Sequence, residues 1–287
     1  MNAATDIETI LVTGAGGQLG VDVVEVAGTR GHRVVGLGRT ELDCTDATRV
    51  AQVVAELRPT AIIHCAAYTK VDDAEEHRDD AFAGNELATQ NVVAAAQSVG
   101  AYLVGVSTDY VFPGTSETGY GEGDATAPIN VYGASKLAGE HAITAEPSFA
   151  VARTAWLFGR TGTNFVRTIA RVAQQRPHID VVTDQVGSPT YTRHLAAALV
   201  AATEQRLAGV LHLAGAPIAT WHEVAVEIVE QLGVECAVRP TTCDAFPRPA
   251  ARPACSILRA TRSDTPTVGD WRDGIREVLA AARPRTP

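Results

Sequence analysis

The 287-residue sequence has no long apolar run, no paired cysteines and no excess of positive charge. No apolar stretch approaches the roughly 20 residues of a membrane-spanning helix, and Met1–Glu8 is polar and acidic, unlike the apolar core of a signal peptide. The five cysteines show no C-x-x-C spacing, which favours reduced, mostly buried thiols over a disulfide framework. The sequence therefore predicts a cytoplasmic protein that does not bind membranes.

Metal-binding patterns and basic surfaces are also missing. The eight histidines show no H-x-x-x-H or comparable metal-ligand spacing. The formal net charge of −9 argues against broad attraction to nucleic acid or to an anionic membrane. An anionic ligand would need a few locally placed basic groups or helix N-termini instead. No internal repeat or low-complexity segment is evident, and we expect Pro284–Pro287 to be a loose tail.

What the sequence does contain is an alternation of apolar strands and amphipathic helices. We expect strands at residues 9–13, 33–37, 61–65 and 102–106, separated by a helix ending at Thr29 and by helices at 47–57 and 79–99. Near-continuous apolar strands between helices indicate a parallel sheet covered on both faces. The predicted fold is α/β, a Rossmann-type doubly wound parallel sheet with a smaller C-terminal substrate-binding lobe.

The 287 residues suffice for one large domain or two closely joined ones, and the second half is less regular than the first. We expect a helix at 190–205, a further sheet strand at 209–213, a helix at 220–232 opened by a Thr220–Glu223 capping box, and a helix at 271–282. The expected domains are a dinucleotide-binding domain over residues 1–155, completed by a returning segment near 188–214, and a mainly substrate-binding lobe over 156–287.

A glycine-rich turn follows the first expected strand. Gly14, Gly17 and Gly20 form G-x-x-G-x-x-G, and Gly16 also gives G-x-G, one residue off the usual G-x-G-x-x-G register. Such a turn lets backbone N–H groups approach a pyrophosphate at the positive end of a helix. Glycines needed only for chain reversal are the plainer interpretation, but the order of strand, glycines and helix favours dinucleotide binding.

The end of the second expected strand bears on which dinucleotide binds. A carboxylate there would accept from the adenosine ribose hydroxyls, whereas an arginine favours a 2′-phosphate. The sequence places Arg39 just beyond the strand, which favours NADPH, although Glu41 is close enough to keep NADH open. Asp43 and Cys44 follow and are candidates for contact with the adenine edge.

A tyrosine and a lysine lie four residues apart at the start of another expected helix. At that spacing the Tyr132 phenol and the Lys136 ammonium share one helix face. The strand before them ends in Ser107-Thr108-Asp109-Tyr110, which delivers polar groups to one edge of the sheet. A neighbouring ammonium favours a phenolate, and lowering a phenol pKa by about 3 units requires roughly 4 kcal/mol of differential interaction. Y-x-x-x-K alone is common by chance, so its context matters.

The context is a set of motifs in a fixed order. They are Thr13-Gly14-x-x-Gly17-x-x-Gly20, Cys65-Ala66-Ala67-Tyr68-Thr69-x-Val71-Asp72, Ser107-Thr108-Asp109-Tyr110-Val111-Phe112, Tyr132-x-x-x-Lys136-Leu137-Ala138-Gly139-Glu140, Arg153-Thr154-Ala155-Trp156, Asn164-Phe165, Asp184-Gln185-Val186-Gly187-Ser188-Pro189-Thr190, Phe246-Pro247-Arg248-Pro249 and Arg252-Pro253. Over about residues 9–256 this set closely resembles the extended short-chain dehydrogenase/reductases and, within them, the dTDP-4-dehydrorhamnose reductase family. The glycine and Y-x-x-x-K motifs identify only the superfamily, and the other motifs narrow it.

The resemblance implies a catalytic set of Thr108, Tyr132 and Lys136. Tyr132 would donate a proton to the sugar ketone oxygen, and Thr108 would hydrogen-bond that carbonyl. Lys136 would bind the nicotinamide ribose and lower the Tyr132 pKa. The chemistry agrees, because hydride addition builds alkoxide charge that a positioned acid and a second donor stabilise in the transition state.

Binding residues follow from the same resemblance. Substrate contacts are expected at Asp109 and at Trp156, whose indole face suits the apolar side of a deoxyhexose. Arg252 is the best candidate for the substrate diphosphate, because it lies in the R-P motif of the family. Asn85 would bridge its helix to the active-site strand, or is purely structural. The expected cofactor contacts are Gly14, Gly17, Gln18, Leu19, Gly20, Arg39, Asp43, Cys44, Ala66, Ala67, Thr69, Val106, Tyr132 and Lys136.

The implied function is NADPH-dependent reduction of dTDP-4-dehydro-β-L-rhamnose to dTDP-L-rhamnose. One alternative is 4-ketoreduction of another dTDP-deoxysugar, and a second is a non-catalytic regulatory subunit like that of methionine adenosyltransferase, which shares much of the motif set. Some family members are thought to use a bridging Mg²⁺, but the helix at 271–282 offers only Asp273 and Glu277, so we predict no metal site. Dimers are common for this fold, so a homodimer is a candidate.

Overall fold

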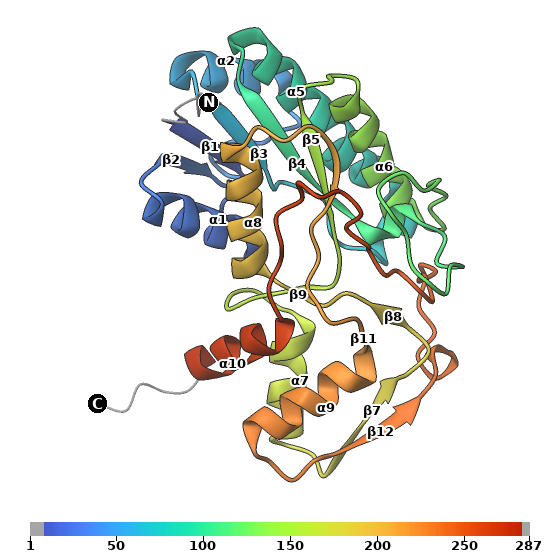
Figure 1. The fold of residues 1–287 in the computed structure, drawn as a ribbon. Helices are drawn as coiled ribbons and strands as arrows, with labels where there is room; N and C mark the ends of the chain where they lie inside the picture. The colour runs from blue at the N-terminus through green and yellow to red at the C-terminus, as the bar shows by residue number, and fades with distance from the viewer. Residues whose placement is uncertain (1–8, 283–287) are drawn as a thin grey trace.

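The computed structural model describes residues 9–282, so the expectations for Met1–Glu8 and Pro284–Pro287 lie outside the described residues. Six parallel strands form the main sheet, in the order β10-β5-β4-β3-β1-β2 (Figure 1). Their bounds are β1 Thr9–Thr13, β2 Arg33–Leu37, β3 Ala61–His64, β4 Tyr102–Thr108, β5 Ala150–Thr154 and β10 Gly209–His212. The register sets Thr13 beside His64 and Thr108 beside Thr154, so the strands end at one edge of the sheet.

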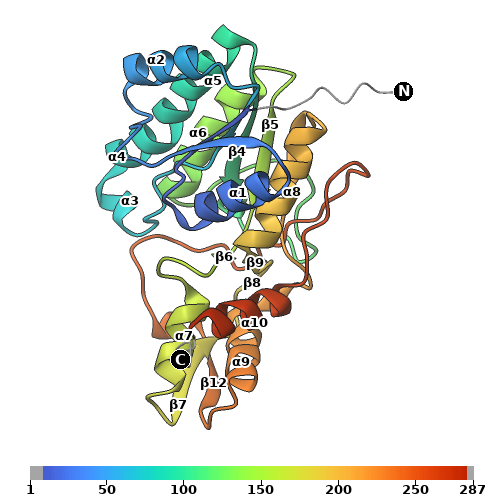
Figure 2. The same cartoon turned by 90° about the vertical axis from the view of Figure 1, so that its left-hand side faces the viewer.

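Helices cover both faces of this sheet (Figure 2). One face carries α1 (Gln18–Thr29) and α8 (Thr192–Glu204), and the other carries α2 (Ala47–Leu57), α5 (Ala88–Val99) and α6 (Val131–Thr144). Strand β1 shows why both faces are needed, since successive side chains point to opposite sides. Ile10 and Val12 are buried with α1 and α8, whereas Leu11 is buried with α2 and α5. The predicted doubly wound fold is confirmed.

The helix expected at 79–99 differs from the prediction. It consists of α4 (Arg78–Phe82), a π-helical turn (Ala83–Leu87) and α5, preceded by the short α3 (Asp73–Glu76). The π-helical turn carries the buried Asn85, which donates to the Ser135 hydroxyl at 2.8 Å and exchanges two hydrogen bonds with the Tyr68 backbone. Asn85 therefore joins α6 to the loop after β3 rather than to the active-site strand. Such turns are frequent at functional sites.

A smaller C-terminal lobe packs against the carboxyl edge of the sheet (Figure 1). Its elements are β6 Leu157–Phe158, α7 Phe165–Ala173, β7 His178–Val182, β8 Val186–Gly187, β9 Thr190–Tyr191, β11 Ala219–Thr220, α9 Trp221–Leu232, β12 Ala237–Thr241 and α10 Trp271–Ala282. A 3-10 turn at Cys243–Ala245 follows β12, and another at Asp109–Val111 directly follows β4 in the main domain. The predicted helix at 220–232 and its capping box are confirmed. The helix expected from Thr190 starts two residues later, because Thr190–Tyr191 pairs with β6.

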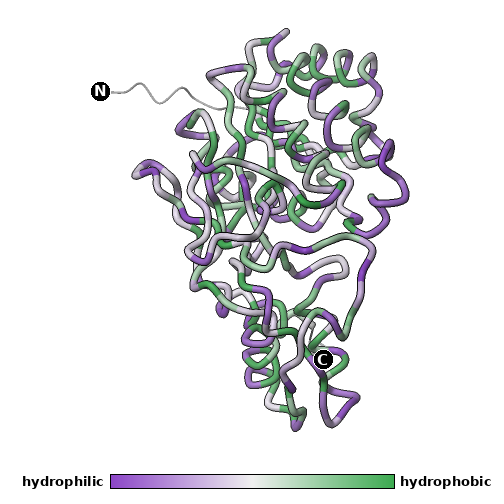
Figure 3. The backbone as a smooth tube through the Cα atoms, turned by 90° about the vertical axis from the view of Figure 1, so that its right-hand side faces the viewer, coloured by the Kyte–Doolittle hydropathy of each residue, from purple (hydrophilic) through white to green (hydrophobic). Residues whose placement is uncertain are grey.

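Apolar segments gather in the main sheet and along the inner sides of its helices, and polar segments gather in the outer loops (Figure 3). Two further clusters of buried side chains hold the C-terminal lobe, one around Trp271 and Tyr191 and one between α9 and β7. Among the described residues, no helix is both long and apolar enough to cross a membrane.

Candidate active site

A cavity of about 1540 Å³ runs along the carboxyl edge of the sheet. It is lined by the turn after β1, the end of β2, the loop after β3, the end of β4, the first turn of α6 and the residues after β5. Ligands of open α/β sheets bind at this edge. The volume exceeds the roughly 300–1,000 Å³ of an ordinary small-molecule pocket. The cavity is therefore large enough for two extended ligands.

Almost every site residue predicted from the sequence lines this cavity. The lining includes Gly14, Gly17, Gln18, Leu19, Gly20, Arg39, Asp43, Cys44, Ala66, Ala67, Thr69, Val106, Thr108, Asp109, Tyr132, Lys136 and Trp156, but not Arg252. Sequence reasoning did not single out Tyr68, Tyr110 or Trp221, which also line it. Tyr68 and Tyr110 lie inside motifs and could have been found there, whereas no motif marks Trp221.

The turn after β1 has room only for glycine at two positions. Gly14 has φ +66°, and a Cβ there would lie 2.6 Å from the Ala66 nitrogen. A Cβ at Gly20 would lie 2.3 Å from the Gly14 carbonyl oxygen. Helix α1 begins after Gly17, without a side-chain cap on its first N–H groups. Open N–H groups at a glycine-lined helix N-terminus are the donor set that a pyrophosphate needs, so these residues fit a dinucleotide.

Helix α6 carries Tyr132 and Lys136 to the opposite side of the cavity. Asn130 caps the helix, because its Oδ1 accepts from the Gly133 N–H at 2.7 Å. The Lys136 ammonium is buried and donates to the Val106 carbonyl at 2.7 Å. Burial lowers the pKa of Lys136 to about 8.

The Tyr132 phenol is held in its protonated form. Its removal from water raises the pKa of Tyr132 to about 12, although a hydrogen bond with Thr108 opposes the rise. Burial is the largest influence on this pKa, and the Lys136 ammonium is directed to the Val106 carbonyl. The role of Lys136 in lowering the Tyr132 pKa stays a prediction. A phenol that keeps its proton at neutral pH suits a proton donor.

Asp109 is a buried carboxylate beside the phenol. It is 2% exposed, and burial raises its pKa to about 6. The Thr108 hydroxyl donates to Oδ1 at 3.0 Å. Hydrogen bonds from the Ser256 side chain and then from Thr108 oppose the rise of the Asp109 pKa. A buried carboxylate on the cavity wall can accept from a ligand hydroxyl group.

The indole of Trp156, predicted to offer a face to the sugar, lies against another aromatic ring on one side. It stacks on Trp221, with ring centroids 3.7 Å apart and planes 5° apart. A Cβ at Gly187 would lie 2.5 Å from the same indole, so β8 packs closely against it. Trp156 also has φ +48°, a strained conformation for a bulky residue. The stack covers one face of Trp156 with a residue from α9.

Arg39 and Arg252 lie in different surroundings. The Arg39 side chain is 87% exposed at the cavity rim, 3.9 Å from Asp43. Glu41 stands beside it and accepts from the Gly38 N–H at 2.8 Å, so both charges predicted at the end of β2 are present. Arg252 instead forms a two-pronged ion pair with Asp72 and does not reach the cavity wall.

The C-terminal helix offers no cluster of metal ligands. Asp273 pairs with Arg276 at 2.8 Å, and Glu277 accepts from the Tyr191 hydroxyl at 2.8 Å. Within residues 9–282, no group of three or more His, Cys, Asp or Glu side chains is placed to hold a metal ion.

Comparison with known proteins gives one consistent family. A family model described as RmlD substrate binding domain matches residues 8–283. A dTDP-4-dehydrorhamnose reductase of Mycolicibacterium smegmatis is 41% identical, over 96% of this chain and 86% of its own length. A probable dTDP-4,6-dihydroxy-2-methyloxan-3-one 4-ketoreductase of Streptomyces antibioticus is 42% identical, over 96% and 97%. The crystal structure of dTDP-4-dehydrorhamnose reductase from Bacillus anthracis in complex with NADP superposes with a TM-score of 0.92, at 39% identity over 96% of this chain and 99% of that one.

Proposed function

Because the chain belongs to the RmlD substrate binding domain family, we propose that it reduces dTDP-4-dehydro-β-L-rhamnose to dTDP-L-rhamnose with NADPH. Family membership establishes that the protein is an NAD(P)H-dependent oxidoreductase that acts on the 4-keto group of a dTDP-sugar. The observation that carries the proposal is the convergence of Thr108, Tyr132 and Lys136 on one cavity with the glycine turn.

The cavity residues divide between the two ligands. We assign the pyrophosphate of the dinucleotide to the N–H groups of the turn at Gly14–Gly20, and its nicotinamide ribose to Lys136. When bound, the reduced nicotinamide supplies a hydride to the keto carbon. Arg39 would pair with a 2′-phosphate, and Glu41 would accept from a free ribose hydroxyl, so we propose NADPH as the preferred cofactor with NADH also accepted.

The chain itself supplies the proton and the stabilisation of charge. Tyr132 donates its phenolic proton to the keto oxygen, which its pKa of about 12 leaves available at neutral pH. Thr108 gives a second hydrogen bond to that oxygen as alkoxide character develops. Lys136 places a positive charge beneath the site, held by the Val106 carbonyl. Asp109 accepts from a sugar hydroxyl, and Trp156 forms an apolar wall.

The domain division extends this assignment. We propose that residues 1–155, with the segment near 188–214, bind the dinucleotide, and that most of 156–287 binds the nucleotide sugar. Strand β10 and helix α8 support this, because they lie in the main sheet and against α1. The homodimer and the cytoplasmic location expected from the sequence stay predictions.

Product analysis tests the proposal. The protein is incubated with NADPH and dTDP-4-dehydro-β-L-rhamnose, and the product is assigned by NMR. We expect dTDP-L-rhamnose as the product, and its absence would rule out reduction of dTDP-4-dehydro-β-L-rhamnose as the function. A parallel series of other dTDP-4-keto-6-deoxysugars tests the second candidate, which the relative from Streptomyces antibioticus favours. If none of these sugars supports NADPH oxidation, the reductase assignment is contradicted and the non-catalytic regulatory role is favoured instead.

A further inference from the structure

A proline-rich segment crosses from the C-terminal lobe to the main domain (Figure 2). We call residues 246–254 the C-terminal strap; it contains three prolines and no helix or strand. Three residues before it, the Cys243 N–H donates to Asp184 at 2.8 Å. Near its end, a Cβ at Gly114 would lie 2.5 Å from Pro253, so the strap packs closely on the loop after β4. The chain is therefore held just before the strap and again near its end.

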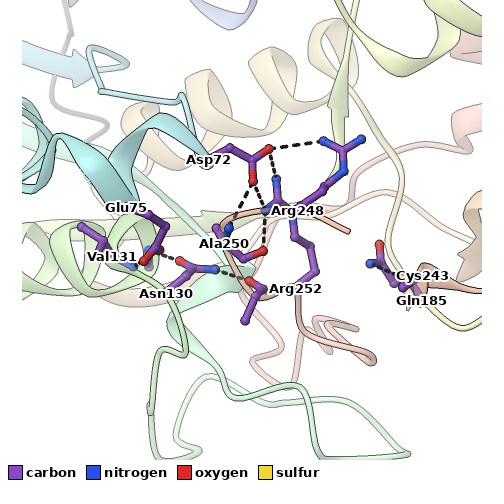
Figure 4. A network of polar contacts seen from close by, with 11 residues as sticks. Asp72, Glu75, Asn130, Val131, Gln185, Cys243, Arg248, Ala250 and Arg252 are labelled. Carbon is purple, nitrogen blue, oxygen red and sulfur yellow. Dashed lines mark hydrogen bonds and ion pairs between the residues drawn. The ribbon is translucent and has the colours of Figure 1, made fainter. Parts of the chain in front are cut away.

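Residues in the middle of the strap form hydrogen bonds and ion pairs with Asp72 (Figure 4). Arg252 donates to both carboxylate oxygens, at 2.5 and 2.9 Å, and the Ala250 N–H donates at 3.3 Å. Arg248 adds a longer contact of 3.4 Å from a side chain that is 61% exposed, against 14% for Arg252. Two-pronged pairs of this kind fix orientation as well as position. The hydrogen bond from Arg252 lowers the Asp72 pKa, which keeps the carboxylate ionised at neutral pH.

The same strap contacts the first turn of α6, the helix that carries the phenol (Figure 4). Asn130 caps α6 through Oδ1, and its Nδ2 donates to the Ala251 carbonyl at 2.8 Å. Glu75, three residues after Asp72, accepts from the Val131 N–H at 2.9 Å. The N-terminus of α6 is thus held between the strap and α3.

A second contact leads from Arg252 to the phenol. Burial, then the charge of Asp109, raises the pKa of Tyr110, and the nearby positive charge of Arg252 opposes that rise, with a smaller contribution from a hydrogen bond. The Tyr110 ring meets the Tyr132 ring edge to face, with centroids 5.8 Å apart and planes at 78°. Arg252 therefore reaches Tyr132 through one intervening aromatic ring.

We propose that Asp72 and Arg252 are positioning residues for the carbonyl reduction: their ion pair docks the strap on α6 and on Tyr110, and so sets the place of the Tyr132 phenol. The inference rests on the proposed function. It also separates two roles for Arg252. A positioning Arg252 depends on Asp72, whereas an Arg252 that binds the substrate diphosphate would be released, not impaired, by loss of Asp72.

Steady-state kinetics of Asp72→Asn, Arg252→Gln and the double variant test the pairing. With NADPH and the dTDP-4-keto sugar, we expect each single variant to lose at least ten-fold in kcat. The double variant should lie within about two-fold of the slower single variant, because partners in one interaction are not additive. Dissociation constants for NADPH and for dTDP should stay within three-fold. Arg248→Gln is the matched control, with kcat within two-fold.

Multiplicative losses in the double variant, or a loss in Arg248→Gln as large as in Arg252→Gln, would overturn the proposal. A loss of dTDP binding in Arg252→Gln alone would make Arg252 a ligand contact. If Asp72→Asn does not fold, Asn130→Ser replaces it, since serine still caps α6 but cannot reach Ala251; its kcat should also fall, and an unchanged kcat would contradict the account.

Hydrogen exchange provides a readout that needs no substrate. We expect faster exchange in the peptide covering 130–136 for Asp72→Asn and Arg252→Gln than for Arg248→Gln or wild type. Unchanged exchange would refute the docking role even in an active enzyme. Conversely, a wild-type protein that does not oxidise NADPH would defeat the proposed function alone, while the exchange result would still decide the role of the strap.

Discussion

Tyr132 and Lys136 lie one helical turn apart, and burial moves their pKa values in opposite directions. Both shifts arise because a charged form loses water. The phenol stays protonated, whereas the ammonium is brought close to its neutral form at moderately alkaline pH. Desolvation therefore shifts the pKa values of Tyr132 and Lys136 more than the interaction between the two groups does.

Lys136 makes the reaction sensitive to alkaline pH. An ordinary lysine titrates near pH 10.5, but here the ammonium is present below about pH 8 and is lost above it. We expect kcat/KM to fall as pH rises through about 8, since this parameter reports the free enzyme. Tyr132 cannot cause the fall, because its pKa is about 12. In Lys136→Arg the fall should move to higher pH; a wild-type profile that is flat to about pH 10 would refute the assignment.

Arg39 gives a test of cofactor preference. Its exposed guanidinium pairs only weakly with Asp43, so it is available to a 2′-phosphate. Arg39→Ala should weaken NADPH binding at least ten-fold and NADH binding less than two-fold, as measured by fluorescence titration. Glu41→Gln is the counterpart and should weaken NADH more than NADPH. Equal losses for both cofactors in Arg39→Ala would defeat the 2′-phosphate argument.

Among the elements, α1 shows how one helix meets two different demands. Its first turn approaches the glycine turn so closely that Gly20 has no room for a Cβ, whereas at Gly28 nothing lies within 4 Å of that position. The first glycine thus serves the ligand end of the helix. The second lies in an open stretch, where glycine only weakens the helix.

Paired substitutions in α1 test this difference. Gly28→Ala should stabilise the protein by roughly 0.5–1 kcal/mol, because alanine is the better helix former. Gly20→Ala should destabilise it and weaken NADPH binding, since its Cβ would meet the Gly14 carbonyl. Urea unfolding and NADPH titration measure the two effects. A neutral Gly20→Ala would show that the turn is not as tight as described.

How far each element could be predicted depended on whether its signal is local. The apolar strands of the first half, the helices at 47–57 and 271–282 and the capping box at Thr220 follow from local pattern and were found. Strand β5 and the β7–β12 pair were not, because polar, charged or proline residues interrupt the apolar pattern of these strands. The Asp72–Arg252 pair spans 180 positions, and neither partner reveals the other in the sequence. For the same reason Trp221 was missed and the pairing of Arg252 with Asp72 was not predicted.

At the scale of the whole molecule, buried histidines make the free energy of unfolding depend on pH in the acidic range. His64 is buried between Thr13 and Thr89. Burial, then the charge of Lys136, lowers its pKa from 6.5 to about 3. Burial likewise lowers the pKa of His212 to about 4. Between these values and 6.5 the unfolded chain binds more protons, so the free energy of unfolding falls as pH falls. Asp109 opposes this between about 6 and 3.8, but its shift is smaller.

The melting temperature should therefore fall as pH is lowered from about 6.5 towards 4. Differential scanning calorimetry across this range measures it, with NADPH absent. In His64→Asn the fall should be shallower, whatever its stability at pH 7, since one of the neutral histidines is gone. A wild-type melting temperature that rises from pH 6.5 to 4 would show that Asp109 outweighs the histidines.

The central claim is that the Tyr132 phenol gives the proton to the substrate ketone. Stopped-flow oxidation of bound NADPH, with dTDP-4-dehydro-β-L-rhamnose as substrate, compares wild type with Tyr132→Phe directly. The account predicts a rate at least about 100-fold lower in Tyr132→Phe with NADPH affinity unchanged within three-fold, as loss of a general acid requires. A rate within a few-fold of wild type would contradict it.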